Sequence, residues 1–229
     1  MLHGLEPAEA MTQACAALAS DTGFDIRYVR ADLASPDGAD AAVAAAQDAF
    51  GGIDILVNNA VVRHFAPLEA FPLERWNQAL AVNLTAPLRM IQAVLPGMRA
   101  RRWGRIFNMT SVYGQRGTTG RVDYVTTKAA IVGLTRAVAA ETAAEPITCN
   151  ALCPGSVSTP GTETRVEQIA AEGGLERAEA VRRFLAGKQP SGRFVEAQNV
   201  ARLLAFLCGP AGDDINGAVM PVDGGWLAT

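Results

Sequence analysis

The sequence predicts an α/β fold in which a doubly wound parallel sheet carries helices on both faces, as a three-layer sandwich. Short apolar runs such as Ile53–Val57 alternate along the chain with longer segments of helical periodicity such as Ala39–Phe50. A continuous apolar run is typical of a parallel strand that is buried on both faces. Because strand–helix–strand crossovers are right-handed, this alternation predicts one parallel sheet covered by helices on its two sides.

The same reading places each element in order along the chain. Strands are expected at Ile26–Val29, Ile53–Val57, Arg105–Met109, Thr148–Leu152 and Ala218–Val222. Helices are expected at Ala39–Phe50, Leu73–Met98 (with a break only near Pro96 and Gly97), Tyr124–Ala140, Val166–Ala186 and Val200–Leu207. The stretch Gly114–Gly120 is expected to be a loop between a strand and a helix, where functional sites often lie.

Length and composition narrow the class of protein. The chain has 229 residues, which suits a single domain over 1–229. Apolar residues make up 49% and the formal net charge is −3, so we expect a globular protein without a nucleic-acid partner. No apolar run reaches the roughly 18 residues of a membrane span, and the first residues lack a signal-peptide pattern. We therefore expect no membrane partner and a cytoplasmic location.

The cysteines do not indicate a metal site. Cys15, Cys149, Cys153 and Cys208 form no Cys-x-x-Cys pair and have no histidine cluster beside them. A zinc site needs about four such ligands at characteristic spacing, so no metal is expected. The simplest interpretation is buried thiols in a reducing compartment.

Three polar residues form the strongest chemical signal. Tyr124 and Lys128 are four positions apart, so a helix would place them on one face, and Ser111 follows a predicted strand. A free phenol has a pKa of about 10, too high for a base at neutral pH, and a neighbouring cation favours the phenolate. A serine hydroxyl can orient a carbonyl or alcohol oxygen. A Tyr-x-x-x-Lys pair alone is common by chance, so its neighbourhood decides the interpretation.

That neighbourhood resembles the classical short-chain dehydrogenase/reductase family. Asn58-Asn59-Ala60 follows a buried strand, Val82-Asn83-Leu84 lies on the next helix, and Ser111 precedes Tyr124 by 13 positions. Cys153-Pro154-Gly155-Ser156-Val157-Ser158-Thr159-Pro160 follows the next strand, and the chain ends in Val222-Asp223-Gly224-Gly225-Trp226. The resemblance covers nearly the whole chain and implies a Rossmann-like fold, a nicotinamide cofactor and oxidoreductase activity.

The resemblance also implies roles for individual residues. Tyr124 would be the general acid/base, Lys128 would lower its pKa and hold the nicotinamide ribose, Ser111 would orient the substrate oxygen, and Asn83 would hold a relay water. The implied cofactor-binding residues are Asp32, Leu33, Asn58, Ala60, Tyr124, Lys128, Pro154, Gly155, Val157 and Thr159. Val61 stands where the family usually has glycine, which crowds the backbone near the cofactor.

One part of the family pattern is missing. Members normally open with a strand, a Thr-Gly-x-x-x-Gly-x-Gly loop and a helix that bind the pyrophosphate, and nothing in 1–229 matches these. Met1–Leu5 resembles the family's second strand. Because the family's first strand is central, its absence should leave a gap in the sheet. Two explanations stay open, a start codon assigned too late and a genuine truncation, and the first is favoured because the other motifs are well preserved.

Residues that resemble a substrate-binding loop suggest that the substrate is an acid. Phe184–Val195, the stretch from Asn58 to Glu69 and the final Asp-Gly-Gly-Trp resemble bacterial D-3-hydroxybutyrate dehydrogenases. Their carboxylate-binding positions correspond here to Arg63, Tyr113, Arg121 and Gln189, of which only Gln189 is unchanged. The two arginines keep an anionic substrate plausible. The alternative is that they are solvated loop charges.

The sequence therefore predicts an NAD-dependent oxidoreductase that acts on a 3-hydroxy acid such as 3-hydroxybutyrate. Leu5-Glu6-Pro7 offers no basic side chain for a 2′-phosphate, which favours NAD over NADP. Two alternatives remain: a family member acting on another alcohol or carbonyl compound, and a catalytically silent relative that acts in assembly. The resemblance also implies a homotetramer built through the segments Leu73–Met98 and Tyr124–Ala140.

Overall fold

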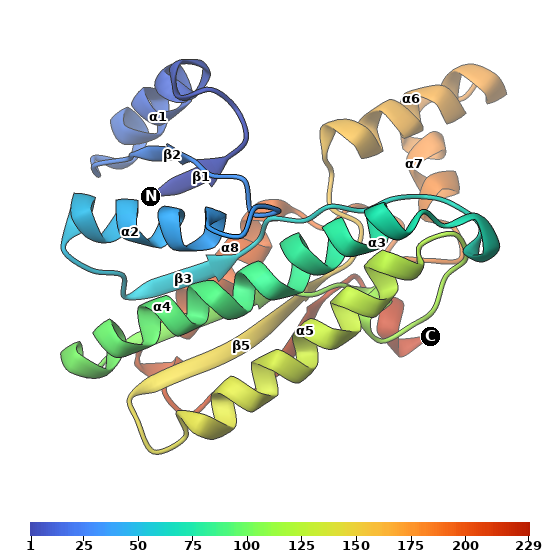
Figure 1. Cartoon of the computed structure of the whole chain (residues 1–229). Helices are drawn as coiled ribbons and strands as arrows, with labels where there is room; N and C mark the ends of the chain where they lie inside the picture. Colours follow the sequence, from blue (N-terminus) through green and yellow to red (C-terminus); the bar gives the residue numbers. More distant parts are fainter.

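The strands form two separate parallel sheets in a computed structural model that describes residues 1–229 (Figure 1). The larger sheet has the order β3-β4-β5-β6 and the smaller one pairs β1 with β2. The strands are β1 (Leu2–Gly4), β2 (Tyr28–Arg30), β3 (Ile55–Asn58), β4 (Gly104–Met109), β5 (Ile147–Pro154) and β6 (Val219–Val222). The predicted α/β fold with parallel strands is confirmed.

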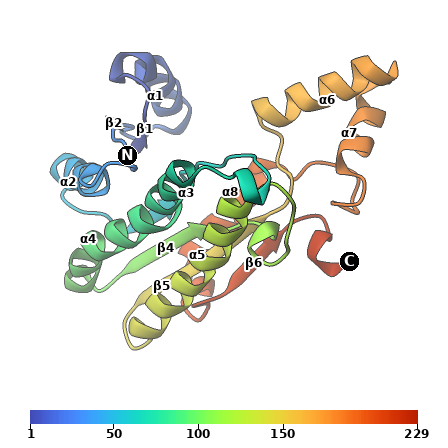
Figure 2. The same cartoon turned by 45° about the vertical axis from the view of Figure 1, so that its right-hand side comes forward.

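Helices cover both faces of the larger sheet (Figure 2). They are α1 (Ala8–Thr22), α2 (Gly38–Phe50), α3 (Leu73–Leu80), α4 (Ala86–Arg101), α5 (Val122–Glu141), α6 (Pro160–Gly173), α7 (Arg177–Leu185) and α8 (Ala197–Cys208). Ile106 on β4 packs with residues of α2, α4 and α5, whereas its neighbour Phe107 packs with α8. Successive strand residues point to opposite faces, so one buried strand supplies both halves of the core.

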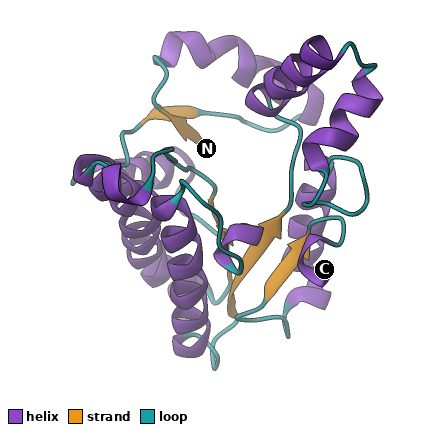
Figure 3. Cartoon of the chain, turned by 90° about the vertical axis from the view of Figure 1, so that its right-hand side faces the viewer, coloured by secondary structure: helices purple, strands orange, loops and turns teal.

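The two sheets do not meet. β1 pairs only with β2, and β3 pairs only with β4, so each has a strand edge without a partner (Figure 3). Ile55 and Val57 on β3 are exposed apolar residues as a result. This is the gap that the resemblance led us to expect between the strand at Met1–Leu5 and the one at Ile53–Val57.

Two expected helices differ from those observed, and one observed helix was not expected. The segment Leu73–Met98 is interrupted not at Pro96 but by a π-helical turn at Ala81–Thr85, and α4 continues through Pro96 to Arg101. Val94 and Met98 are both buried, so packing holds the helix on either side of the proline. The segment Val166–Ala186 divides into α6 and α7, because Gly174 closes α6 with a φ of 58°. The helix α1 was not expected.

The run from Leu73 to Arg101 is also the one helical stretch long and apolar enough, by length and composition, to cross a membrane. Its buried residues Met90, Ile91, Val94 and Met98 pack within the main core against the sheet. This packing identifies it as a core helix.

Candidate active site

A cavity of ≈ 700 Å³ lies at the carboxyl ends of the central strands of the larger sheet. Asn59 follows β3, Thr110 and Ser111 follow β4, and Gly155 follows β5, and all four line it. Ligands of open parallel α/β sheets bind at this edge. Ten of the sequence-predicted residues line this cavity: Arg63, Ser111, Tyr113, Arg121, Tyr124, Lys128, Pro154, Gly155, Val157 and Thr159.

Helix α5 is tied to the end of β4 at the cavity wall. The Thr110 hydroxyl donates to the backbone carbonyl of Lys128 at 2.7 Å, and the Lys128 ammonium donates to the carbonyl of Met109 at 2.5 Å. These contacts connect β4 with the helix turn that carries Tyr124 and Lys128. The Nζ atom of Lys128 lies 5.7 Å from the centre of the Tyr124 ring.

Burial changes the acidity of Lys128. The residue is 5% exposed, and this desolvation lowers the pKa of its ammonium from 10.5 to about 8. The group is therefore cationic at neutral pH but close to titration. A buried cation beside a phenol and a serine hydroxyl can stabilise negative charge on an oxygen during proton transfer.

The first turn of α5 is positioned by a buried acid. Asp123 is fully buried, and one carboxylate oxygen accepts from the backbone N–H of Tyr124 at 2.6 Å. Its other oxygen accepts from the backbone N–H of His64 at 3.0 Å and contacts the His64 ring at 3.1 Å. His64 thus joins the loop after β3 to the helix that carries Tyr124.

Asn83 lies in the π-helical turn and does not line the cavity. Its amide oxygen accepts from the backbone N–H of Val62 at 2.9 Å, and its amide nitrogen donates to the Val62 carbonyl and to the Thr127 hydroxyl. It holds the loop after β3 against α5, one layer behind Tyr124. π-turns of this kind occur often at functional sites.

Arg121 and two aromatic rings form one wall of the cavity. The Arg121 guanidinium lies 4.3 Å from the centre of the Phe65 ring and 5.5 Å from that of Tyr113. Tyr113 in turn packs edge-on against Trp226, with ring centres 5.4 Å apart. Neither Arg121 nor Arg63 forms an ion pair with a carboxylate. Both guanidinium groups are available to an anion.

The other predicted cofactor residues lie away from this cavity. The Asn58 amide donates to the Asn108 side chain at 2.8 Å. Leu33 belongs to the main core, and Ala60 packs against it. Asp32 follows β2 and accepts from the backbone N–H of Ala34. Asn58 and Ala60 end or follow β3, which borders the gap between the two sheets, whereas Asp32 and Leu33 follow β2 in the smaller sheet.

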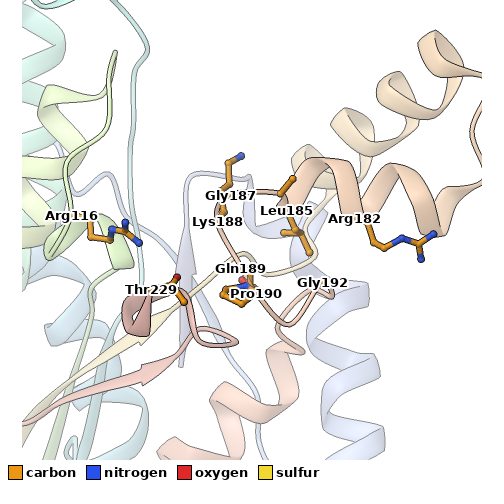
Figure 4. A pocket seen from close by; sticks show the side chains of 10 residues that line it. Arg116, Arg182, Leu185, Gly187, Lys188, Gln189, Pro190, Gly192 and Thr229 are labelled. Atoms are coloured by element: carbon orange, nitrogen blue, oxygen red, sulfur yellow. The ribbon is translucent and has the colours of Figure 1, made fainter.

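Gln189 is not brought together with the arginines. It is buried, its amide oxygen accepts from the backbone N–H of Ser156 at 2.8 Å, and its amide nitrogen donates to the carbonyl of Arg193. It lines a separate cavity of ≈ 470 Å³ beside Arg116 and Thr229 (Figure 4). Both ends of its side chain are used by the backbone, so it supports the segment after β5.

Two cations at the site, and a third on the smaller sheet, were not found from the sequence. Arg165 on α6 and Lys188 after α7 line the larger cavity, and the Arg30 guanidinium donates to the Leu5 carbonyl at 3.0 Å, next to Glu6. No motif marks Arg165. Arg30 ends a strand that pairs with β1, so the strand pairing alone could have pointed to it.

The donor set suits one half of a nicotinamide dinucleotide. Lys128 and the hydroxyls of Ser111, Tyr124 and Thr159 face one cavity with the backbone at Pro154–Gly155, a set that can hydrogen-bond ribose hydroxyls and a carboxamide. No glycine-rich loop in residues 1–229 accompanies the facing edges of β1 and β3. The donors that line this cavity therefore suit the nicotinamide half of such a cofactor.

The fold and this cluster define a class of protein, and comparison with known proteins agrees. The family model described as enoyl-(acyl carrier protein) reductase matches residues 3–227, and the chain belongs to the short-chain dehydrogenase/reductase family. It is an oxidoreductase of that family.

Two curated relatives carry the same description. The chain is 40% identical to D-beta-hydroxybutyrate dehydrogenase of Cupriavidus necator over 206 residues, which cover 90% of this chain and 80% of the relative. It is 35% identical to D-beta-hydroxybutyrate dehydrogenase of Rhizobium meliloti, over 95% of this chain and 83% of the relative.

Solved structures show the same fold. L-sorbose reductase from Gluconobacter frateurii, complexed with NADPH and L-sorbose, aligns with a TM-score of 0.91 at 27% identity, covering 100% of this chain and 86% of that one. Gluconate 5-dehydrogenase from Burkholderia cenocepacia, in complex with NADP and tartrate, aligns with a TM-score of 0.84 at 29% identity, covering 100% and 85%.

Proposed function

We propose that this protein oxidises a 3-hydroxy acid, such as 3-hydroxybutyrate, to the 3-oxo acid with NAD. One observation carries the proposal: Ser111, Tyr124 and Lys128 share a cavity with two arginines that have no carboxylate partner. The first three suit proton transfer at an alcohol, and the arginines suit a carboxylate. The D-beta-hydroxybutyrate dehydrogenases among the relatives support this substrate class.

In this proposal each group of the chain has one task. The Ser111 hydroxyl orients the substrate oxygen, and the Tyr124 phenolate accepts its proton. The Lys128 ammonium stabilises the phenolate and binds the ribose hydroxyls. The bound cofactor supplies the acceptor for the hydride that leaves C3. Asn83 is a positioning residue, because it fixes the Val62 backbone and Thr127 behind Tyr124.

Arg63, Arg121 and Tyr113 would hold the substrate carboxylate. The guanidinium of Arg121 lies over the Phe65 ring, so little side-chain freedom is lost when it binds an anion. Gln189 would act indirectly, through the backbone of Ser156.

The remaining predicted residues would follow the cofactor along the sheet edge: Asp32 and Leu33 beside the adenine, Asn58 and Ala60 along its length, and Pro154, Gly155, Val157 and Thr159 around the nicotinamide. NAD is favoured because the Glu6 carboxylate follows β1, where it would accept from a ribose 2′-hydroxyl and repel a 2′-phosphate. Arg30 beside Leu5 supports the alternative, NADP, which is also the cofactor described with the solved neighbours. Comparing turnover with NAD and NADP in wild type and Glu6→Gln decides between them, since NAD preference should fall in the variant.

The test of the proposed reaction compares 3-hydroxybutyrate with its neutral amide. Residues 1–229 and a version with a glycine-rich strand–loop–helix fused ahead of Met1 are assayed for cofactor reduction. We expect kcat/KM for the acid to exceed that for the amide by about tenfold or more, since a charge-assisted contact contributes about 1.5–3 kcal/mol.

Two variants assign the groups. Tyr124→Phe should lower kcat by about 10²–10⁴-fold, the range for loss of a general base. Arg121→Gln should raise KM for the acid but not for the amide. The control Arg182→Gln should change neither, because Arg182 does not line this cavity and pairs with Glu179. Equal turnover of acid and amide by the wild type would exclude the carboxylate clamp.

We further propose a homotetramer formed through α4 and α5, and a cytoplasmic location. Ala129 and Gly133 on α5 are exposed small residues that would allow close helix packing. The four cysteines are free thiols, two of them buried, which suits a reducing compartment.

A further inference from the structure

The larger cavity is cationic beyond what one carboxylate requires. Besides Arg63, Arg121 and Lys128, it is lined by Arg165 and Lys188, and none of its 22 lining residues is an aspartate or a glutamate. Arg63 precedes α3 and Arg121 precedes α5, whereas Arg165 lies on α6 and Lys188 follows α7. The second pair of cations therefore comes from a different part of the chain, the α6–α7 hairpin at the carboxyl end of the sheet (Figures 1 and 2).

These two cations lack the partners that their neighbours have. Arg177 pairs with Glu163, and Arg182 and Arg183 pair with Glu179, all within the same hairpin. Arg165 instead donates only to the neutral Gln168 side chain at 3.0 Å, and the Lys188 ammonium lies 4.6 Å from the Phe184 ring. The hairpin neutralises its outward charges and leaves those that face the cavity without an anion.

The positive charges that line the larger cavity repel one another. The pKa of Lys188 is lowered, first by partial burial and then by the positive charges of Arg121 and Arg165. Groups that interact in this way lie near each other in a partly desolvated space, where like charges repel more strongly than in water. An anion bound between them would remove this repulsion.

The smaller cavity offers no comparable arrangement. Lys188 lines this cavity as well, but its other two cations, Arg116 and Arg182, lie on opposite sides (Figure 4). Arg116 donates to the carbonyl of Trp226 at 2.9 Å, and Arg182 is paired with Glu179. Only the larger cavity combines unpaired cations with the Ser111–Tyr124–Lys128 cluster.

We propose that the substrate has two anionic groups, and we call such an acid a dianion whatever the charge of its second group: it is a 3-hydroxy acid whose far end carries a second carboxylate or a phosphate, bound by Arg165 and Lys188. This inference rests on the proposed function, in which Arg63 and Arg121 bind the first carboxylate. The chemistry at C3 is unchanged. The second anion determines which acid is bound, because a monoacid would leave two facing cations unneutralised.

The test measures binding rather than turnover, by calorimetric titration of residues 1–229 and of the version with the glycine-rich strand–loop–helix ahead of Met1, each with and without NADH. The probes are 3-hydroxybutyrate, 3-hydroxyglutarate and 4-phospho-3-hydroxybutyrate, so that a second carboxylate and a phosphate are compared directly. We expect at least one dianion to bind about tenfold or more tightly than the monoacid, as a charge-assisted contact implies.

The variants locate the second anion. Arg165→Gln and Lys188→Met should each lower the affinity for the preferred dianion about tenfold. Each should leave the affinity for the monoacid within about twofold of the wild-type value. The matched control Arg182→Gln, from the same hairpin, should change neither. Arg121→Gln should weaken monoacid and dianion alike, which reports on the proposed function separately.

Each contrary result has a distinct meaning. The second anion site is overturned if the wild type binds the monoacid and the dianions equally, or if the preference for a dianion survives in both variants. The proposed function still stands in that case if Arg121→Gln weakens binding of the acids. If both variants lower the affinity for NADH by the same factor and leave the preference for the dianion unchanged, then Arg165 and Lys188 bind the cofactor pyrophosphate. This inference is then wrong. No binding of any acid overturns both proposals.

Discussion

The ammonium of Lys128 lies 5.7 Å from the centre of the Tyr124 ring, one helical turn away on α5. Its only hydrogen-bond partner in the protein is the carbonyl of Met109, and burial lowers its pKa to about 8. Burying the Lys128 ammonium with a single hydrogen-bond partner costs free energy, so its charge lowers the free energy of unfolding. The structure thus predicts a measurable link between pH and stability.

Replacing Lys128 with methionine should therefore stabilise the fold at neutral pH. Below pH 8 both the folded and the unfolded chain carry the proton, so the full cost of burying the cation is present. Between about pH 8 and 10.5 the folded chain loses the proton while the unfolded chain keeps it, and the free energy of unfolding rises with pH. The advantage of Lys128→Met, at most about 3 kcal/mol from the two pKa values, should shrink across this window.

Urea unfolding of both proteins between pH 7 and pH 10 measures this difference. A constant gap in unfolding free energy over that range would show that Lys128 does not titrate as proposed. If turnover requires the Lys128 cation, kcat should also decline above about pH 8, in the same window.

Gly114 should tolerate no side chain. A Cβ there would lie 2.5 Å from the Lys128 carbonyl oxygen and 2.6 Å from the Thr110 hydroxyl, the two groups whose hydrogen bond ties β4 to α5. Gly114→Ala should destabilise the protein by about 1–3 kcal/mol, the usual cost of overpacking. Gly117→Ala is the matched control in the same loop, because nothing lies within 4 Å of its Cβ position. Equal melting temperatures for the two variants would contradict this account.

Assembly can be tested at Gly133 without disturbing the subunit. Nothing lies within 4 Å of a Cβ at this exposed helical position, and glycine is the poorer helix former, so Gly133→Glu should not destabilise the monomer. If α5 packs against its copy, the variant should be smaller by light scattering at micromolar concentration while the wild type is a tetramer. A monomeric wild type would refute the tetramer.

The central site could be predicted from sequence because each of its residues lies on a single helix or directly after a single strand. Tyr124 and Lys128 share a helix face by spacing, and Ser111 follows an apolar strand, so the parallel sheet brings them to one edge. Arg165 and Lys188 could not be found in this way. Their approach depends on how the α6–α7 hairpin folds back, and the expected single helix Val166–Ala186 would have placed them differently. Gln189 matched the subfamily pattern, yet backbone contacts occupy its side chain.

The last prediction concerns the gap between β1 and β3. A polypeptide of residues 1–229 should bind NAD weakly, because the pyrophosphate would lie beside two unpaired strand edges with no loop amides or helix N-terminus to neutralise it. Lys128 and Thr159 would still contact the nicotinamide half. Fusing a strand, glycine-rich loop and helix ahead of Met1 should pair both edges, raise the melting temperature and strengthen NAD binding.

Calorimetric NAD titration of the two forms measures this directly, with a loop whose glycines are replaced by alanine as the control. That control can still fill the sheet, but its side chains would keep the backbone from the pyrophosphate. It should therefore recover stability without recovering affinity. Micromolar NAD binding by residues 1–229 alone would contradict the prediction, and would mean that other groups, such as Arg30 beside Leu5, bind the phosphates instead.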